Sequence, residues 1–158
     1  MKKILCQIPS KLDRRMKKIP EFAVNIAMRL VIFQIFWFSV QDKISGWTLA
    51  GQHFAFWNIS NHAFLLFDFE YDIPFLSSTL ATYMATFGEF FLSLMILLGL
   101  LTRFAALGLA MMTLVIQFFV FPDKWWTVHV YWMLILLYLI KYGGGSFSLD
   151  NYFEKTKD

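Results

Sequence analysis

Residues 88–104 read GEFFLSLMILLGLLTRF, a stretch that is apolar almost throughout. A transmembrane helix needs about 20 mostly apolar residues, so this stretch predicts most of one membrane span. Glu89 stands near its start and Arg103 near its end. A charge inside the hydrocarbon is costly, and such a residue normally faces the interior of a helical bundle, where it finds a partner. The stretch therefore predicts a polytopic membrane protein and raises the question of what Glu89 contacts.

The composition of the whole chain supports the same class. Of its 158 residues, 58% are hydrophobic, and they include 19 Phe, 6 Trp and 6 Tyr. An ordinary soluble domain is about 45–50% apolar. The mean hydropathy is +0.56, and the excess is spread over several long blocks rather than one core helix. We therefore predict an all-α fold, a polytopic membrane four-helix bundle.

Four segments are long and apolar enough to span. They are residues 22–40, 80–101, 104–121 and 125–142. We divide the chain into a basic cytoplasmic or interfacial segment (1–21), a four-helix transmembrane domain (22–142) and a cytoplasmic C-terminal tail (143–158).

The placement of Lys and Arg predicts the orientation. Residues 1–21 hold seven basic side chains, and Lys and Arg concentrate on the cytoplasmic side of membrane proteins. Arg103 lies in the turn after the second span, and the tail is again basic, so both termini are expected in the cytoplasm of a cell (inner) membrane. The bilayer explains the basic N-terminal segment, and we expect no nucleic-acid partner.

Between the first and second spans lies a very aromatic segment. Residues 46–76 mix aromatic and polar side chains, and their apolar runs are too short to span. Tyr and Trp favour the membrane–water boundary. We expect one or two interfacial or re-entrant helices there.

A set of polar residues falls within the predicted spans. The candidate intramembrane cluster comprises Arg29, Gln34, Glu89, Gln117 and His129. On the second span, Glu89 shares a four-residue spacing with small side chains, which predicts that it faces other helices. Arg29 lies at a depth from which its long side chain reaches toward Glu89, so we predict an Arg29–Glu89 pair, either direct or through water. Such a pair either fixes helix register or lines a functional cavity.

His129 leaves several roles open. A histidine at this depth can relay protons, hydrogen-bond a quinone carbonyl, bind a metal or simply pack in the core. The three histidines and the single cysteine, Cys6, show none of the dense spacings of metal motifs, so we predict no metal site. One cysteine also excludes dithiol chemistry within a single chain.

Further residues are candidates for turns and topology rather than chemistry. They are Lys43, Arg103, Gly143, Gly145 and Asp150. Glycines accept the left-handed conformation that ends helices, and Asp150 or Ser148 is placed to cap a short helix after them.

Three blocks of the chain resemble the DoxX family of small four-helix membrane proteins. They are MRLVIFQIFWFSVQDKISGW (28–47), EFFLSLMILLGLLTRFAALGL (89–109) and the ending GGGSFSLD (143–150). The block at 112–132 is similar to a branch associated with copper handling. The resemblance places the family's polar positions at Arg29, Lys43, Glu89, Arg103 and His129. It implies a membrane subunit of a redox system, including quinone-linked or thiol-linked ones.

Three functions follow as hypotheses. The first is an accessory or anchoring subunit of a redox, oxidative-stress or copper-stress system, not catalytic alone, with quinone as the candidate cofactor. The second is a small proton- or ion-coupled transporter, and the third is a quinone-linked oxidoreductase subunit. Each also predicts contact with the lipid bilayer and with a membrane or peripheral protein partner, or with further copies of the chain.

Overall fold

A computed structural model describes residues 20–71 and 73–156 of the chain, which are mostly helical. The basic segment 1–21 lies outside the described residues except for its last two. The helices are α2 (Glu21–Gln41), α3 (Asn61–Phe69), α4 (Ser78–Leu98), α5 (Thr102–Val115), α6 (Val130–Tyr142) and α7 (Leu149–Lys155). The shorter elements are β1 (Thr48–Leu49), β2 (Gln52–His53), the π-helices η1 (Ile116–Val120) and η3 (Trp125–His129), and the 3₁₀ turn η2 (Pro122–Lys124).

Three helices of the described chain are long and apolar enough to cross a membrane. They are α2, α4 and the continuous helix Thr102–Val120 that α5 and η1 form together. These helices agree with three of the predicted spans to within a few residues. The region of the fourth prediction is also helical, as η3 followed directly by α6.

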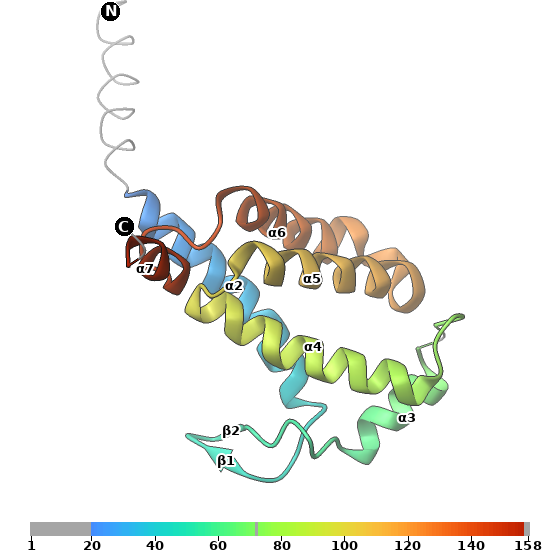
Figure 1. The fold of residues 1–158 in the computed structure, drawn as a ribbon. Helices are drawn as coiled ribbons and strands as arrows, with labels where there is room; N and C mark the ends of the chain where they lie inside the picture. Colours follow the sequence, from blue (N-terminus) through green and yellow to red (C-terminus); the bar gives the residue numbers. More distant parts are fainter. Residues whose placement is uncertain (1–19, 72, 157–158) are drawn as a thin grey trace, which may run out of the picture.

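The long helices pack side by side around an apolar core (Figure 1). In the described chain, α2 contacts α4 and α6, and α5 lies between α4 and α6. The core combines small residues of α5 with larger side chains of its neighbours, namely Ile32, Phe36, Ile96, Ala105, Ala106, Leu109, Ala110, Leu136 and Leu139. Large apolar side chains such as Phe104 and Phe118 point outward instead. Small residues between the helices and large apolar side chains on the outer surface are expected of helices surrounded by lipid.

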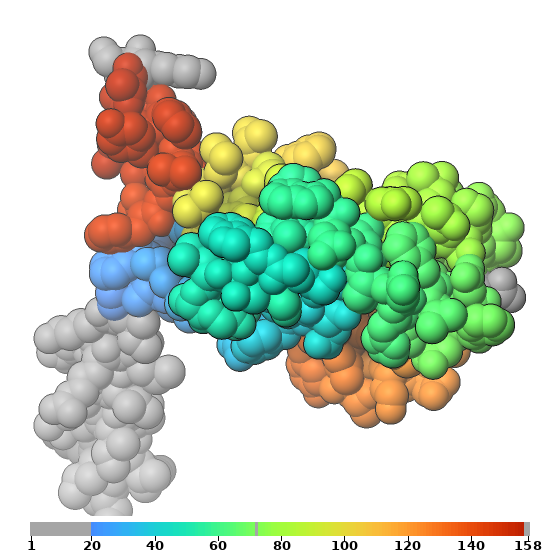
Figure 2. All heavy atoms as spheres, turned by 90° about the horizontal axis from the view of Figure 1, so that it is seen from below, coloured from blue at the N-terminus to red at the C-terminus, as the bar shows by residue number. Residues whose placement is uncertain are grey.

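The aromatic segment differs from the prediction. Its first part forms the two-stranded antiparallel hairpin β1–β2, and only its second part contains a helix, α3. Together they cover one face of the helical body, where Figure 2 shows them in cyan to green. The hairpin is tied to α2, because the Trp37 indole N–H donates to Gln52 Oε1 (2.8 Å) and Gln41 bonds to the His53 backbone in both directions. Such long-range contacts have no local sequence pattern.

The C-terminal segment folds back against the turn between α4 and α5. The Asp150 carboxylate accepts hydrogen bonds from the backbone N–H of Leu101 (2.6 Å) and Thr102 (2.9 Å), and from the Thr102 hydroxyl (2.8 Å). It thereby satisfies N–H groups at the start of α5 that have no partner within the helix. Ser148 caps α7. Of the two candidates, Ser148 is thus the local cap, and Asp150 caps a helix nearly fifty residues away.

Candidate functional site

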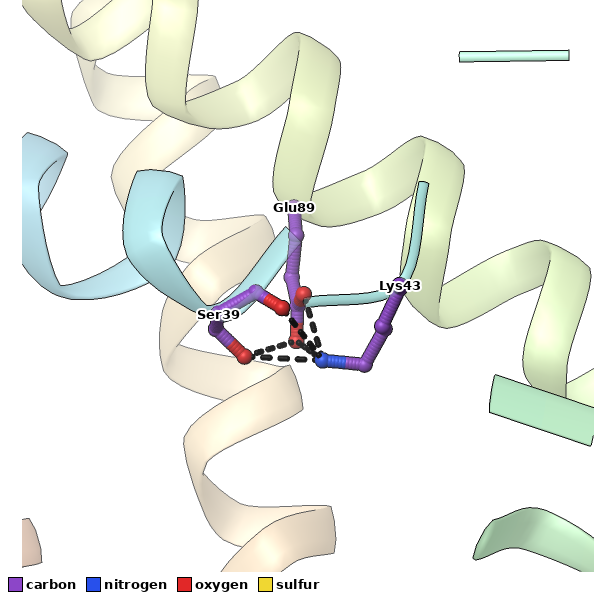
Figure 3. A network of polar contacts seen from close by, with 3 residues as sticks. All are labelled: Ser39, Lys43 and Glu89. Atoms are coloured by element: carbon purple, nitrogen blue, oxygen red, sulfur yellow. Dashed lines mark hydrogen bonds and ion pairs between the residues drawn. The ribbon is translucent and has the colours of Figure 1, made fainter. Parts of the chain in front are cut away.

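Glu89 forms an ion pair with Lys43, as Figure 3 shows. The Lys43 ammonium lies 2.9 Å from Glu89 Oε2 and 3.2 Å from Oε1. It also donates to Ser39 Oγ (2.8 Å), and the Ser39 hydroxyl donates to Glu89 Oε1 (3.1 Å). Glu89 is 3% exposed and Lys43 8% exposed. Glu89 is therefore buried, and the Lys43 ammonium balances its negative charge.

Two features of the fold hold Lys43 in this place. Lys43 lies one helical turn after Ser39, so the two side chains share one face at the end of α2. A cation is favoured beside the negative end of a helix dipole. The segment after β2 then holds the backbone, because the Ser60 N–H donates to the Lys43 carbonyl (2.8 Å) and the Ser45 N–H to the Asn58 carbonyl (3.0 Å). The aromatic segment thus keeps the ammonium under Glu89.

The predicted Arg29–Glu89 pair is wrong. The Arg29 guanidinium donates instead to four backbone carbonyls, which we call the carbonyl cluster: those of Ile96 (2.8 Å), Leu97, Gly144 (3.1 Å) and Phe147 (2.6 Å). The reason is that the last carbonyls of a helix lack partners within it, and α4 ends at Gly99 with a left-handed φ of 67°. Arg29 lies level with those carbonyls, two turns or more away from Glu89.

Gln117 and His129 form a second polar pair. His129 Nδ1 lies 2.6 Å from Gln117 Oε1, and Gln117 Nε2 donates to the Pro122 carbonyl (2.5 Å). Gln117 lies in η1 and His129 in η3, the two π-helical segments on either side of the turn η2. π-Helical turns inside α-helices often occur at functional sites. Both side chains are buried, as the sequence predicted.

The other candidate residues do not join these pairs. Gln34 is exposed on the outer surface of α2, so its place in an interior cluster was wrong. Arg103 is also exposed, at the start of α5. Gly143 and Gly145 both have positive φ, and the Gly143 carbonyl accepts a hydrogen bond from Asn25 (2.8 Å). These glycines belong to the turn that brings Asp150 back to the helices, as predicted for a turn.

A cavity of about 510 Å³ is lined by the Lys43–Glu89 pair and by His129 of the second pair. This volume lies within the range of about 300–1,000 Å³ that is typical of small-molecule sites. The wall is apolar over most of its area, with side chains from α2, α4, α5 and η1, including Phe36, Ala85, Leu92, Met111, Met112 and Val115. Its polar members include Ser39, Lys43 and Glu89, with His129 among the residues contributed by the last helices. An apolar chamber with few polar groups is suited to a mostly apolar ligand with polar substituents.

Tyr71 lines the same cavity from the segment between α3 and α4. Its ring packs edge-on against Phe121, which also belongs to the wall. Burial raises the pKa of Tyr71 above its ordinary value, and the nearby carboxylates of Glu70 and Glu89 raise that pKa further. Tyr71 therefore keeps its phenolic proton at neutral pH and offers the cavity a neutral hydroxyl.

Comparison with known proteins identifies the family. The family model described as DoxX matches residues 24–122, well over half of the chain. The chain belongs to the DoxX family. No curated protein and no solved structure matches it significantly. The DoxX match and the three apolar helices together make this an integral membrane protein in contact with the lipid bilayer.

The DoxX match includes part of the site described above. It runs from α2 to the start of η2, so it contains the Lys43–Glu89 pair and Gln117, whereas His129 follows it. In residues 20–71 and 73–156, no group of three or more His, Cys, Asp or Glu side chains is arranged to hold a metal ion.

Sequence reasoning missed Ser39 and Tyr71 and gave Lys43 only a topological role. A signal existed for two of them, because Ser39 and Lys43 are spaced by four residues at the end of a predicted helix. Tyr71 had no such signal, since its place in the wall depends on how the segment after α3 packs.

Proposed function

We propose that this DoxX-family protein binds a membrane-soluble quinone or quinol in the cavity beside Glu89. In this role it serves as an accessory subunit of a redox, oxidative-stress or copper-stress system, in which a partner exchanges electrons with the bound ring. The observation that carries the proposal is the apolar cavity of about 510 Å³ with the buried Lys43–Glu89 pair in its wall. A buried ionic pair usually costs stability compared with apolar packing, so its position against open space favours a binding role.

The chemistry of the wall supports this ligand class. A quinone ring is apolar on both faces and carries polar oxygens at opposite ends, and its tail is soluble in lipid. The aromatic and aliphatic wall suits the ring, and Glu89 and His129 supply separate polar groups for its oxygens. Cys6, the chain's single cysteine, supports an accessory role because dithiol chemistry requires two.

Two alternatives have less support. A proton- or ion-coupled transporter needs its buried charges along one path, but Arg29 is engaged by the carbonyl cluster and is not among the residues that line the cavity with Glu89 and His129. The hypothesis of a quinone-linked oxidoreductase subunit shares the quinone site, but it further requires residues that hold a redox group beside the ring, and the cavity wall described above gives no observation in its favour. We therefore retain the accessory role.

The proposal includes a topology. We propose that residues 125–142 form a fourth span, that both termini lie in the cytoplasm of a cell (inner) membrane, and that the hairpin and α3 lie at the outer interface. The unbroken run of η3 and α6 and the exposed aromatic side chains Trp47, Trp57 and Trp126 support this arrangement. Reporter fusions after residue 74 and after residue 158 should report opposite sides of the membrane. A common side would contradict it.

The experiment for the binding role is identification of the ligand that the protein retains. We expect the full chain, purified in mild detergent, to carry quinone or quinol in its organic extract. The Ala85→Trp variant should lose it, because Ala85 lines the cavity and an indole would fill the space. Ala27→Trp is the matched control, since Ala27 is exposed on α2. Equal ligand content in both variants, or none in the wild type even after added quinone, would contradict the proposal. Proteins that copurify with the chain would identify the partner.

A further inference from the structure

The hydrogen bonds around His129 fix which of its ring nitrogens carries a proton. Gln117 Nε2 donates to the Pro122 carbonyl, so the amide oxygen Oε1 must face His129. A flipped amide would place two acceptors 2.5 Å apart, which is repulsive. Oε1 can only accept, so His129 Nδ1 must be the donor. In a neutral imidazole the other nitrogen, Nε2, is then a pure acceptor.

The second nitrogen of His129 is the polar atom that this ring can offer to a ligand. His129 lines the cavity, and its Nδ1 is already engaged by Gln117. The cavity thus has a fixed acceptor at this point.

The ion pair at the other polar wall also offers an acceptor. A lysine ammonium has three protons to donate. The ammonium of Lys43 has four acceptors around it, which are the carbonyl and hydroxyl oxygens of Ser39 and the two carboxylate oxygens of Glu89. The Ser39 hydroxyl has one proton, and it is directed at Glu89 Oε1. No proton of either group remains for a ligand. Among the described residues, Glu89 Oε2 accepts a hydrogen bond from Lys43 alone, which leaves a carboxylate lone pair for a further donor.

We propose that the cavity selects the reduced, dihydroxy form of its ring ligand: a quinol, which donates one hydroxyl to Glu89 and the other to His129 Nε2. This inference rests on the proposed function and specifies the form of the ligand. A quinone has only acceptor oxygens at its two ends, so it donates a hydrogen bond neither to Glu89 nor to His129 Nε2. Tyr71 does not discriminate, because a hydroxyl donates and accepts. Trp132 also lines the cavity, and its indole N–H is a donor that suits a quinone oxygen.

The test uses probes that cannot exchange redox state. We would measure equilibrium binding of an alkyl-1,4-hydroquinone, its monomethyl ether and its dimethyl ether to the full chain in nanodiscs. Each methylation removes one donor, and we expect affinity to fall about tenfold at each step. A dimethyl ether that binds as tightly as the hydroquinone would overturn the inference and leave the proposed function standing. If no probe binds, including the corresponding quinone, the proposed function fails as well.

A variant of Gln117 tests the positioning role of this residue. In Gln117→Leu, Nδ1 loses its acceptor and the imidazole is free to present Nε2–H to the cavity, so the tenfold preference for a hydroxyl at that end should disappear. Trp132→Phe is the matched control, and it should keep or increase the preference for the hydroquinone. A preference unchanged in Gln117→Leu would overturn the role of Gln117, and a preference lost in Trp132→Phe would assign the selection to the indole.

Discussion

The two buried cations among residues 20–71 and 73–156, Arg29 and Lys43, make contacts of different kinds. Arg29 donates to four backbone carbonyls and joins the ends of α4 and α6 to the C-terminal segment. Lys43 contacts a carboxylate that lines a cavity. Two of these carbonyls belong to the end of α4, where the last carbonyls need partners, and the other two belong to the segment between α6 and α7, so this contact is structural. Lys43 also donates to the Ser39 carbonyl in the last turn of α2, but its contact with Glu89 is one that no helix end requires. The comparison shows that burial alone does not distinguish a structural charge from one in a binding site. The chemistry of its partners and the presence of a cavity beside it do.

The largest expected effect is at the cavity. Lys43→Met leaves the buried Glu89 carboxylate without its cation, and breaking a buried pair in this way costs about 3–5 kcal/mol. We expect the free energy of unfolding, measured by denaturant titration in mixed micelles, to fall by that amount. Arg103→Met is the matched control, because Arg103 is exposed, and its effect should be within about 0.5 kcal/mol. A Lys43→Met protein as stable as the control would show that Glu89 is not held as an ion pair.

The sequence was sufficient to predict the helices and the burial of Arg29 and Glu89, but not their partners. The positions of the helices followed from the hydrophobic runs, the inward-facing position of Glu89 from its four-residue spacing, and the family from the quoted motifs. Partner choice did not follow, because it depends on where α4 ends. Gly99 ends that helix, and Arg29 is then drawn to the carbonyls that the end leaves free. The pairing of Lys43 further depends on the hairpin segment, whose contacts with α2 span residues without a periodic pattern.

Two Gly→Ala substitutions, one at the C-terminal turn and one at the cavity, are expected to have effects of intermediate size. At Gly144, a Cβ would lie 2.6 Å from Ser148 Cβ and from Thr102 Oγ1, so Gly144→Ala overpacks the C-terminal turn. We expect it to lower stability by about 1–3 kcal/mol without changing the affinity of the folded protein for the hydroquinone probe.

At Gly88, the added Cβ would meet the sulfur of Met112 at 3.0 Å, and a methionine can move. Gly88 and Met112 both line the cavity. Gly88→Ala should therefore leave stability unchanged or raise it by up to about 1 kcal/mol, and weaken probe binding because the cavity becomes smaller. Thermal unfolding and probe titration on the same samples measure both quantities. The reverse pattern, with probe binding sensitive to Gly144→Ala alone, would place the site at the C-terminal turn.

The smallest effect concerns Tyr71 at alkaline pH. Because the folded state raises the pKa of Tyr71, the phenol is neutral in both states below about pH 10 and its contribution to stability is fully present there. As pH rises further, the unfolded chain loses this proton first, and the contribution is lost as pH passes through the folded pKa. Tyr71→Phe should therefore lose less stability than the wild type above pH 10. Glu70→Gln should lower the pKa of Tyr71, measured by the ultraviolet absorbance of tyrosinate. A pKa that rises or stays fixed in Glu70→Gln would contradict the assigned cause.

The coupling free energy of Glu89 with each buried cation tests the central claim most directly. Two double-mutant cycles in unfolding free energy combine Glu89→Gln with Lys43→Met and with Arg29→Lys. Residues in contact couple by about 0.5–3 kcal/mol, whereas distant residues add to within about 0.5 kcal/mol. We predict strong coupling of Glu89 with Lys43 and additivity of Glu89 with Arg29. Additivity with Lys43 together with strong coupling to Arg29 would contradict the separation of the cavity pair from the carbonyl cluster.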